Sequence, residues 1–339
     1  MAITLNKLYP GKLEPGLLEE LITKYTSGDE RLVQGAKYGE DAAVIDMGGD
    51  RLLVLKSDPI TCAAKDIGTY AVHINANDIV CMGAIPKWFL ATILLPERAR
   101  RTLAGELFAQ ISRVCREQRI AYCGGHVEVS AGLDRPIISG HMAGEMSRSQ
   151  LMLKSHIKAG DHVVLVQSIP VETVSILARE KSKELAAQFS KDFVEKCRNV
   201  LYDPGISIRR YAEIARKTAD IHAMHDPTEG GLATAIHEFA SAAGLGVTID
   251  QNKIPVSVEG KLACDFFDLN PLGCIASGSL LLAVPYKSIA PLLKAYAAES
   301  IPAADIGKFV DTDQGYVLVN QDRKRKLPMF ARDEIIKVL

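Results

Sequence analysis

The sequence predicts an α+β protein built from two mixed domains. Its 339 residues, 47% of them hydrophobic, exceed the usual size of a single core. Strand-like and helical runs mix in both halves without the regular alternation of a Rossmann domain. A Lys-Ala-Gly-Asp turn at 158–161 leads into a new strand-like run. We therefore expect a first domain over residues 1–154 and a second over residues 155–339.

The expected elements of the first half follow from hydrophobic spacing and from turn residues. An apolar stripe that begins at Leu17 predicts a helix of about three turns near the N-terminus. A second helix is expected to begin after Asp66, which can cap it, and to end before Gly83. Helical spacing returns over 99–118. Strands are expected at 42–46, 51–58, 88–96, 120–125 and 136–146.

The second half shows the same mixture of elements. A buried strand is expected at 163–167, and a strand pair or one long strand at 271–285. The helical segments are 171–180, 183–201, 206–218 and 232–244.

Composition excludes several classes of protein. Forty basic and forty-one acidic residues give a net charge of −1, so no nucleic-acid footprint is visible. No apolar run approaches the ~18–20 residues of a membrane span, and no secretory leader is visible. The seven cysteines form no C-x-x-C pair and indicate free thiols in a reducing cytoplasm. We expect a cytoplasmic protein that binds neither nucleic acid nor membrane.

Acidic residues of the first half occupy the ends of expected strands. Glu40 and Asp41 stand in GEDAAVID, and Asp58 ends the strand-like run LLVLKSD. Adjacent carboxylates beside a buried strand resist dehydration, so they are either solvated turn residues or await a positive partner. Asp58 is explained equally well as a solvated turn residue that precedes Pro59.

Asp78 is the most informative of these acids. On a helix it shares one stripe with Ile67, Ala71, Ile74 and Cys81, so its carboxylate points where apolar side chains point. A buried carboxylate needs a cation, a metal or hydrogen bonds. Asn75 and Asn77 flank the same turn. The alternative is a carboxylate that accepts backbone hydrogen bonds across a domain seam.

The stretch CGGHVEV combines two glycines with a histidine and an acid. Gly124 and Gly125 let a backbone approach a phosphate, and His126 is followed by Glu128 two residues later. A hairpin-like turn is the plainer interpretation. Several carboxylates at strand and helix ends suit Mg²⁺, which takes oxygen ligands and bridges to phosphate.

The loop HDPTEGGL precedes an expected helix. Thr228 can cap that helix, and Gly230 with Gly231 leaves first-turn amides open for an anion. A loop with an N-cap explains Thr228 but not two glycines. His222 and His225 form an H-x-x-H pair without a nearby cysteine, which argues against zinc.

These clusters, in this order, resemble the AIR synthase superfamily, and most closely its HypE-like members. The resemblance rests on GEDAAVID, KSDPI, IGTYAVHINANDIVCMGAIP, CGGHVEV, DPTEGGLA and IASGSLLLAV. It implies two AIR synthase-type domains, the first of which binds ATP with Mg²⁺ and forms a homodimer.

The same resemblance implies roles for individual residues. Asp41, Asp58 and Asp78 would hold metal ions, with Glu128 or His126 replacing a family aspartate. The remaining cofactor-binding residues would be Asn75, Gly124, Gly125, Thr228, Gly230 and Gly231. Lys12 would neutralise transferring charge and Asp226 would face the phosphates, so these two are the expected catalytic residues.

The sequence departs from the HypE pattern at one point that bears on activity. HypE proteins end in a cysteine that carries the carbamoyl group, whereas this sequence ends EIIKVL and its last cysteine is Cys274. We expect an ATP- and Mg²⁺-dependent enzyme that phosphorylates, and in one version dehydrates, a small amide- or carbamoyl-type substrate. The alternatives are a kinase of the thiamine-monophosphate type and a non-catalytic ATP-binding partner in metalloenzyme maturation.

Overall fold

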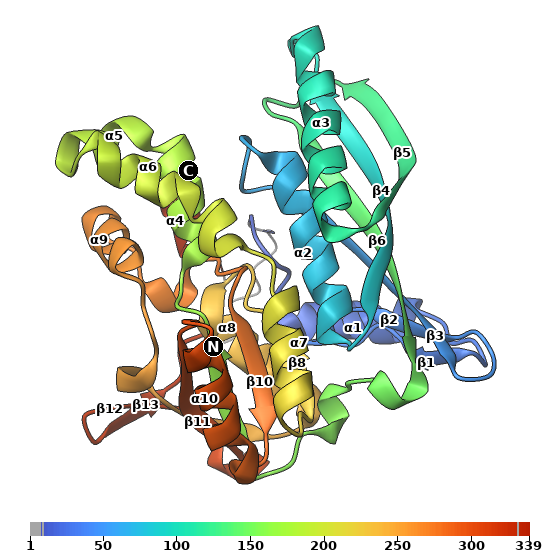
Figure 1. Cartoon of the computed structure of the whole chain (residues 1–339), viewed down its shortest axis with the longest axis vertical. Coiled ribbons are helices and arrows are strands. Elements are labelled where there is room, and N and C mark those ends of the chain that lie inside the picture. Colours follow the sequence, from blue (N-terminus) through green and yellow to red (C-terminus); the bar gives the residue numbers. More distant parts are fainter. Residues whose placement is uncertain (1–7, 9, 331) are drawn as a thin grey trace.

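The protein contains two mixed β-sheets, one in each half of the chain (Figure 1). The structure is a computed structural model that describes residues 8, 10–330 and 332–339. One pair in each sheet, β4 with β5 and β9 with β12, runs parallel, while the remaining described pairs are antiparallel. This arrangement confirms the predicted α+β class.

The first half forms a six-stranded sheet in the order β1-β2-β3-β6-β4-β5. Its strands are β1 (Leu32–Gln34), β2 (Ala43–Asp46), β3 (Arg51–Ile60), β4 (Ile85–Pro96), β5 (Ala121–Ser130) and β6 (Ile137–Ser147). Its helices are α1 (Pro15–Tyr25), α2 (Ile67–Cys81) and α3 (Arg101–Gln118). Helices α2 and α3 pack against one face of this sheet (Figure 1).

The second half forms a seven-stranded sheet in the order β13-β12-β9-β11-β7-β10-β8. Its strands are β7 (His162–Val166), β8 (Ala223–His225), β9 (Gly246–Asp250), β10 (Leu280–Val284), β11 (Ala303–Val310), β12 (Tyr316–Asn320) and β13 (Arg323–Lys326). Its helices are α4 (Val171–Glu180), α5 (Ser182–Gln188), α6 (Lys191–Asn199), α7 (Arg209–Thr218), α8 (Gly231–Ala243), α9 (Val258–Phe267) and α10 (Ile289–Ala298).

Most expected elements are present, with two clear differences. The helical segment expected at 183–201 is divided into α5 and α6, because the backbone leaves helical geometry at Phe189 and Ser190. The segment 271–285 contains a single five-residue strand, β10, preceded by a 3₁₀ turn at Pro271–Gly273, rather than a long strand. The seven cysteines are all free. The first sheet ends at Ser147 and the second begins at His162, and the domain boundary at 154 stays a prediction within that interval. None of the helices in the described residues has the length and apolar character of a bilayer crossing.

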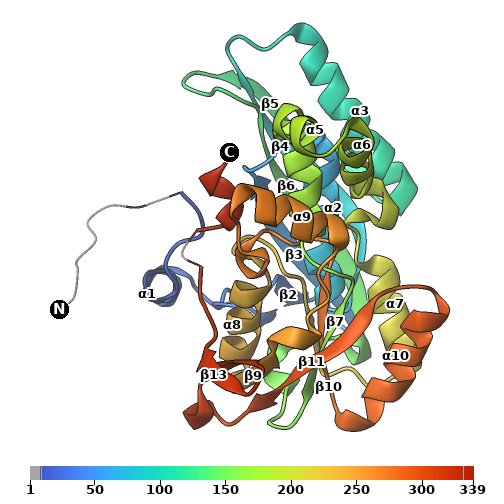
Figure 2. The same cartoon turned by 90° about the vertical axis from the view of Figure 1, so that its left-hand side faces the viewer.

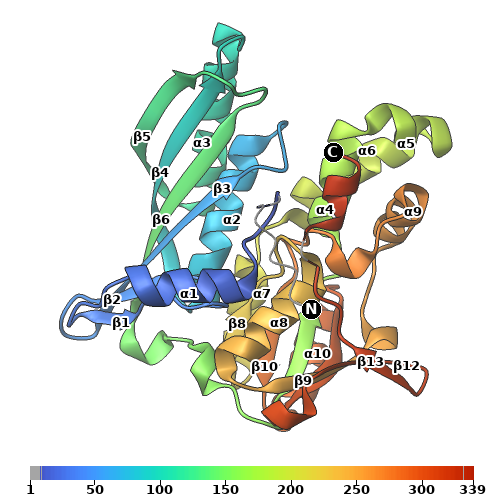
Figure 3. The same ribbon diagram turned by 180° about the vertical axis from the view of Figure 1, so that it is seen from behind.

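Helix α2 joins the two halves (Figure 3). The Asn77 side chain donates to the carbonyl of Ile206 at 2.9 Å and accepts from the backbone N–H of Ile208 at 3.1 Å. The Tyr70 hydroxyl lies 2.6 Å from that of Ser175 on α4. One apolar cluster includes residues of both halves. The seam is therefore a packed, hydrogen-bonded contact that fixes the residues on either side of α2.

Two segments from the ends of the chain lie near this seam. Figure 2 shows α1 beside α8, and the C-terminus near α9. Helix α1 begins at Pro15, after Glu14 accepts the first amides of the helix, as proline at N1 and an N-cap acid favour. Its predicted apolar stripe is present, but none of its side chains is fully buried. The stripe therefore forms a wall of a cavity rather than part of a core.

Candidate functional site

A cavity of about 1190 Å³ lies where the two halves meet. Its walls come from α1, the loop before β2, the end of β3, α2, the loop before α8, and four residues near the C-terminus, Met329, Phe330, Arg332 and Asp333. The expected site residues that line it are Lys12, Asp41, Asp58, Asp78, Asp226, Thr228 and Gly230. The fold thus brings together most of the site predicted from sequence, from segments separated by more than 200 residues.

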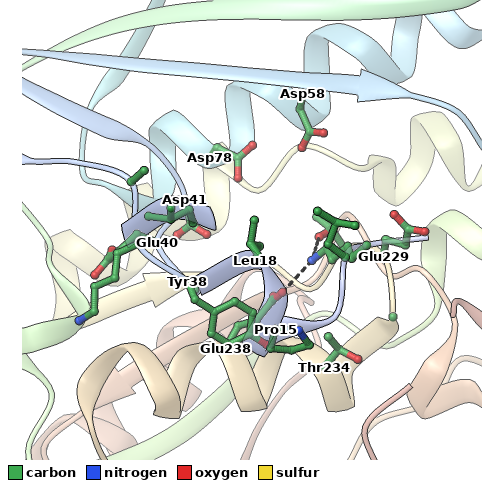
Figure 4. Close-up of a pocket in the computed structure, with 18 of the residues that line it drawn as sticks. Pro15, Leu18, Tyr38, Glu40, Asp41, Asp58, Asp78, Glu229, Thr234 and Glu238 are labelled. Atoms are coloured by element: carbon green, nitrogen blue, oxygen red, sulfur yellow. Dashed lines mark hydrogen bonds and ion pairs between the residues drawn. The ribbon is translucent and has the colours of Figure 1, made fainter. Parts of the chain in front are cut away.

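The acids and the helix α8 occupy opposite sides of this cavity. Figure 4 shows Asp41, Asp58 and Asp78 on one side, Thr234 and Glu238 on the other, and α1 between them. Asp41 and Asp78 are buried, whereas Asp58 is partly exposed. Such a concentration of buried carboxylates is unfavourable unless cations accompany it.

Asp41 already has two cationic partners within the chain. Lys154 Nζ lies 2.7 Å from one carboxylate oxygen of Asp41, and His225 Nδ1 lies 2.7 Å from the other. Lys154 also donates to the carbonyl of Gly39. Burial alone would raise the pKa of Asp41, but His225 and Lys154 hold that pKa well below its usual range. Asp41 is therefore ionised and fixed by these two partners.

The contacts continue from His225 to Lys12. His225 Nε2 lies 3.3 Å from one oxygen of Glu238, and Lys12 Nζ lies 2.9 Å from the other. Against the effect of burial, the neighbouring Asp41 raises the pKa of His225. An imidazole between two carboxylates is stabilised as the cation. The result is an alternating row of charges, Lys12, Glu238, His225, Asp41 and Lys154.

Lys56 provides a third internal cation. Its Nζ lies 3.3 Å from a carboxylate oxygen of Asp78 and 3.7 Å from one of Asp58. Burial opposes the charge on Lys56, yet Asp78 and Asp58 raise its pKa above the ordinary value. Lys56 and Asp58 are two residues apart on β3, so their side chains lie on the same face of the strand, toward α2 and Asp78.

Three buried carboxylate oxygens accept no hydrogen bond from the described residues. They belong to Glu40, Asp78 and Asp226, and the Asp78 oxygen has only the ion pair with Lys56 Nζ at 3.3 Å. Burial raises the pKa of Asp78 well above its usual range, and burial together with Asp41 raises the pKa of Asp226 to about 6. The ligand atoms of Asp41, His225 and Asp226 lie within 4.8 Å of one another. Carboxylate oxygens that accept no hydrogen bond and lie among further acids fit a divalent cation that prefers oxygen ligands.

The loop before α8 is less open than its glycines suggest. The N-cap of α8 is Gly230, not Thr228, and the amide of Gly230 donates to the Asp333 carboxylate at 2.8 Å. The amide of Gly231 donates to the carbonyl of Thr228 at 2.9 Å. Both glycines have positive φ angles, of 84° and 68°, which explains their identity. The carboxylate of Asp333 already lies at the start of the helix. The expectation that the amides of Gly230 and Gly231 are open is therefore wrong.

Thr228 faces the cavity without capping the helix. Its hydroxyl lies 3.4 Å from Lys12 Nζ, which places both groups at one end of the cavity. Glu40 also lines the cavity, and one of its oxygens is buried. Asn75 lies behind Asp58 and donates to its carbonyl at 3.1 Å. Asn75 therefore positions the end of β3 rather than facing the cavity.

The residues of CGGHVEV do not reach this cavity within one chain. Asp58 pairs with Gly140, Gly140 with Ala91, and Ala91 with Gly125, which is three strand spacings. At ~4.8 Å per spacing, Gly125 lies roughly 14 Å from Asp58. The plainer hairpin-turn interpretation is wrong, because these residues belong to strand β5.

His126 and Glu128 form an exposed pair on β5, with Nε2 and Oε2 3.2 Å apart. They lie on the edge strand, away from Asp58 and Asp78, so Glu128 cannot share a metal ion with those acids in a single chain. Gly125 also has a structural reason for its identity, since a Cβ there would lie 1.9 Å from the carbonyl oxygen of Ala91.

Comparison with known domain families identifies both halves. The N-terminal domain of AIR synthase related proteins matches residues 39–146, and the C-terminal domain matches residues 158–320. The chain belongs to the AIR synthase-related protein family. The sequence resemblance is thus confirmed over both domains.

Curated relatives in this family include hydrogenase-maturation proteins. A putative hydrogenase expression/formation protein of Methanocaldococcus jannaschii is 28% identical, over 81% of this chain and 80% of the relative. The carbamoyl dehydratase HypE of Rhizobium leguminosarum is also 28% identical, over 83% of this chain and 80% of the relative. The chain is therefore HypE-like in sequence.

Solved structures with the same fold come from two branches of the AIR synthase family. HypE in complex with ATP superimposes with a TM-score of 0.67 at 23% identity, covering 94% of this chain and 96% of that one. HypE in complex with HypF superimposes with a TM-score of 0.71 at 19% identity, covering 93% of this chain and 99% of that one. A ThiL protein with AMPPCP and TMP superimposes with a TM-score of 0.72 at 20% identity, covering 93% of this chain and 94% of that one. At these identities the likeness shows the fold alone.

Sequence reasoning missed four charged residues in this AIR synthase-related site. They are Lys56, Lys154, His225 and Glu238, and each lies within hydrogen-bond or ion-pair distance of an expected residue. Lys56 carried a usable signal, because it stands two residues before Asp58 on the same strand face. His225 was noticed only as half of a histidine pair. Lys154 and Glu238 gave no local signal.

Proposed function

We propose that this chain is an ATP- and Mg²⁺-dependent enzyme that phosphorylates a small amide- or carbamoyl-type substrate and then dehydrates it. The observation that carries the proposal is the cavity in which buried acids from both halves meet a lysine from the N-terminal segment. Its volume of about 1190 Å³ exceeds that of typical single-ligand sites, so a nucleotide and a small substrate fit together.

The carboxylates suit Mg²⁺ bound with phosphate. Asp226 would hold the ion through its unpartnered oxygen, and Asp78 through the oxygen that lies 3.3 Å from Lys56 Nζ, with Asp58 beside them. When bound, Mg²⁺ would supply positive charge that stabilises the phosphate groups of the nucleotide. Asp41 would act differently from the family expectation, because Lys154 and His225 already occupy both of its oxygens. Its role in this proposal is to keep His225 charged and in place.

Lys12 would stabilise charge on the transferring phosphoryl group. Its ammonium is held by Glu238, remains partly exposed, and lies 3.4 Å from the Thr228 hydroxyl at one end of the cavity. Desolvation opposes its charge, but the Glu238 carboxylate overcomes this effect and raises the pKa of Lys12. A cation fixed in advance near the transferring group lowers the barrier without reorganisation during the reaction. Lys12→Met should therefore reduce kcat far more than it changes the affinity for ATP.

The chemistry of the substrate follows from phosphoryl transfer to an amide oxygen. ATP would donate its terminal phosphoryl group to the carbonyl oxygen of the amide. Loss of that oxygen as phosphate, with departure of both amide protons, leaves a carbon–nitrogen triple bond. The HypE relatives, which are named carbamoyl dehydratases, support this sequence of steps. A kinase would stop after the first step, as the ThiL neighbours suggest.

A homodimer is part of the proposal, because one face of the first sheet is apolar and uncovered. Leu55, Ala143 and Trp88 form a row across β3, β6 and β4 on the face opposite α2. Leu55 and Trp88 are 38% and 37% exposed. A second copy on this face would bury these side chains and provide a neighbour for His126 and Glu128. The solved HypE–HypF complex supports a maturation protein as a further partner.

The deciding experiment identifies products from ATP and a panel of amide, carbamoyl and phosphorylatable metabolites. The proposal expects ADP, phosphate and a dehydrated product, with activity lost in Asp226→Asn and retained in the exposed control Asp265→Asn. A stable phosphorylated product would establish the kinase instead. Tight ATP binding without turnover of any substrate would indicate a non-catalytic maturation partner.

A further inference from the structure

A second cavity of about 630 Å³ lies on the other side of α2 from the acidic site. It lies where the end of α3 meets the start of α7, so both halves of the chain contribute to it. Its charged and polar lining residues are His73, Glu117, Gln118, Arg119, Tyr202, Ser207, Arg209, Arg210 and Glu213. Three guanidinium groups against two carboxylates give this lining a positive charge. Neither the family resemblance nor the proposed reaction gives these residues a role.

His73 is the residue through which α2 reaches this second cavity. Every other residue of α2, from Ile67 to Cys81, is fully buried. The Nδ1 atom of His73 is itself buried and has no hydrogen-bond partner among the described residues. The other ring nitrogen, Nε2, is not enclosed and has no hydrogen-bond partner among the described residues, so a ligand in the cavity can bind it.

The first turn of α7 adds a second unsatisfied feature. Its N-cap, Ile208, has no side-chain acceptor, and its first two residues are Arg209 and Arg210. A helix N-terminus carries a partial positive charge, and the two arginines add to it even though Glu213 and Glu299 pair with their side chains. Acidic residues are absent from this turn. An anion in the cavity would relieve that charge and accept from the open amides of the first turn.

The arginines differ in how firmly they are held. Arg209 donates to the carbonyl of Gln118 at 2.9 Å and to Glu213 at 3.1 Å, which fixes it across the seam. Arg210 pairs with Glu299. The side chain of Arg119 makes no hydrogen bond or ion pair within the described residues. Arg119 is therefore the guanidinium most able to bind a ligand.

We propose that this second cavity, between α2, the end of α3 and the start of α7, binds a phosphate-bearing small molecule. Arg119 and the first-turn amides of α7 would hold the phosphate, and the neutral imidazole of His73 would donate from Nε2. The exposed ring of Tyr202 lines the same cavity and offers a surface for the rest of the molecule. Guanidinium groups and backbone amides together are the usual ligands of phosphate.

The electrostatic state of His73 provides an independent readout. Burial and the nearby charge of Arg113 lower the pKa of His73 to about 4. A bound dianion would oppose both effects and raise this pKa. Nuclear magnetic resonance of the imidazole, with and without ligand, measures that change directly.

The test uses the full chain with inorganic pyrophosphate as the probe, without Mg²⁺, followed by calorimetry. Arg119→Glu reverses a charge in the second cavity, and Arg116→Glu makes the same change on α3 outside it. Lys12→Met removes a cation from the acidic site. We expect Arg119→Glu to weaken binding about tenfold or more, as loss of a charge-assisted contact does. Arg116→Glu and Lys12→Met should leave the affinity within about twofold of wild type.

Each other outcome overturns the assignment. Loss of binding in Lys12→Met alone would place the probe in the acidic site. Equal weakening by Arg119→Glu and Arg116→Glu would indicate a diffuse charge effect. Absence of pyrophosphate binding, or an unchanged His73 pKa at saturation, would exclude the phosphate site. Circular dichroism of the variants confirms that they remain folded.

Discussion

Replacement of Lys154 by methionine tests the buried charge row most sharply. The side chains of Lys154 and Asp41 are only 2% and 4% exposed, and their charged atoms are 2.7 Å apart. Removal of one partner from a buried pair costs about 3–5 kcal/mol, since the other charge is left uncompensated. His225 still contacts the second oxygen of Asp41, so we expect the lower end, about 3 kcal/mol.

Urea unfolding at pH 7 measures this cost. Lys158→Met is the matched control, because Lys158 is exposed, and its effect should stay within about 0.5 kcal/mol. The double variant Asp41→Asn with Lys154→Met should recover at least about 1 kcal/mol, because the uncompensated carboxylate is gone. A loss below about 1 kcal/mol in Lys154→Met would refute the reasoning that Asp41 depends on this lysine.

Two further predictions concern His225 and Gly125. The pKa of His225 is raised in the folded protein. The stability that its charge adds is therefore complete below the ordinary pKa near 6.5 and is lost as pH rises through the folded-state pKa. Wild-type stability should thus fall as pH rises above about 6.5, and His225→Gln should flatten that slope; an equal slope in both proteins contradicts the charge row. Gly125→Ala should cost about 3 kcal/mol or more, because φ is +141° and the new Cβ would meet the Ala91 carbonyl. Gly124→Ala, with φ of +112° and open space around it, should cost only about 1 kcal/mol; equal shifts in Tm would disprove the steric argument.

The sequence allowed the fold and one half of the site to be predicted. Helical spacing placed Asp78 on a buried face, and the structure confirms that burial. The strand end at Asp58 and the loop at Asp226 also line the cavity. These residues carry local signals, because periodicity and turn chemistry depend on neighbours in the sequence.

The remainder of the site depends on contacts that are distant in the sequence. Lys154 lies 113 residues from Asp41, and Glu238 lies 226 residues from Lys12. Glu128 illustrates the converse case. Its motif suggested the acidic site, but the strand order β3-β6-β4-β5 separates it from Asp58. Strand order is a property of the whole chain, and no local pattern specifies it.

The central claim is that the acids around Asp78 bind ATP together with Mg²⁺. Calorimetric titration of ATP into the wild type, Asp78→Asn and the exposed control Asp134→Asn, each with and without Mg²⁺, tests it most directly. The account predicts that Mg²⁺ tightens ATP binding to the wild type and to Asp134→Asn about tenfold or more, and has no effect on Asp78→Asn. Equal enhancement by Mg²⁺ in all three proteins would contradict the account.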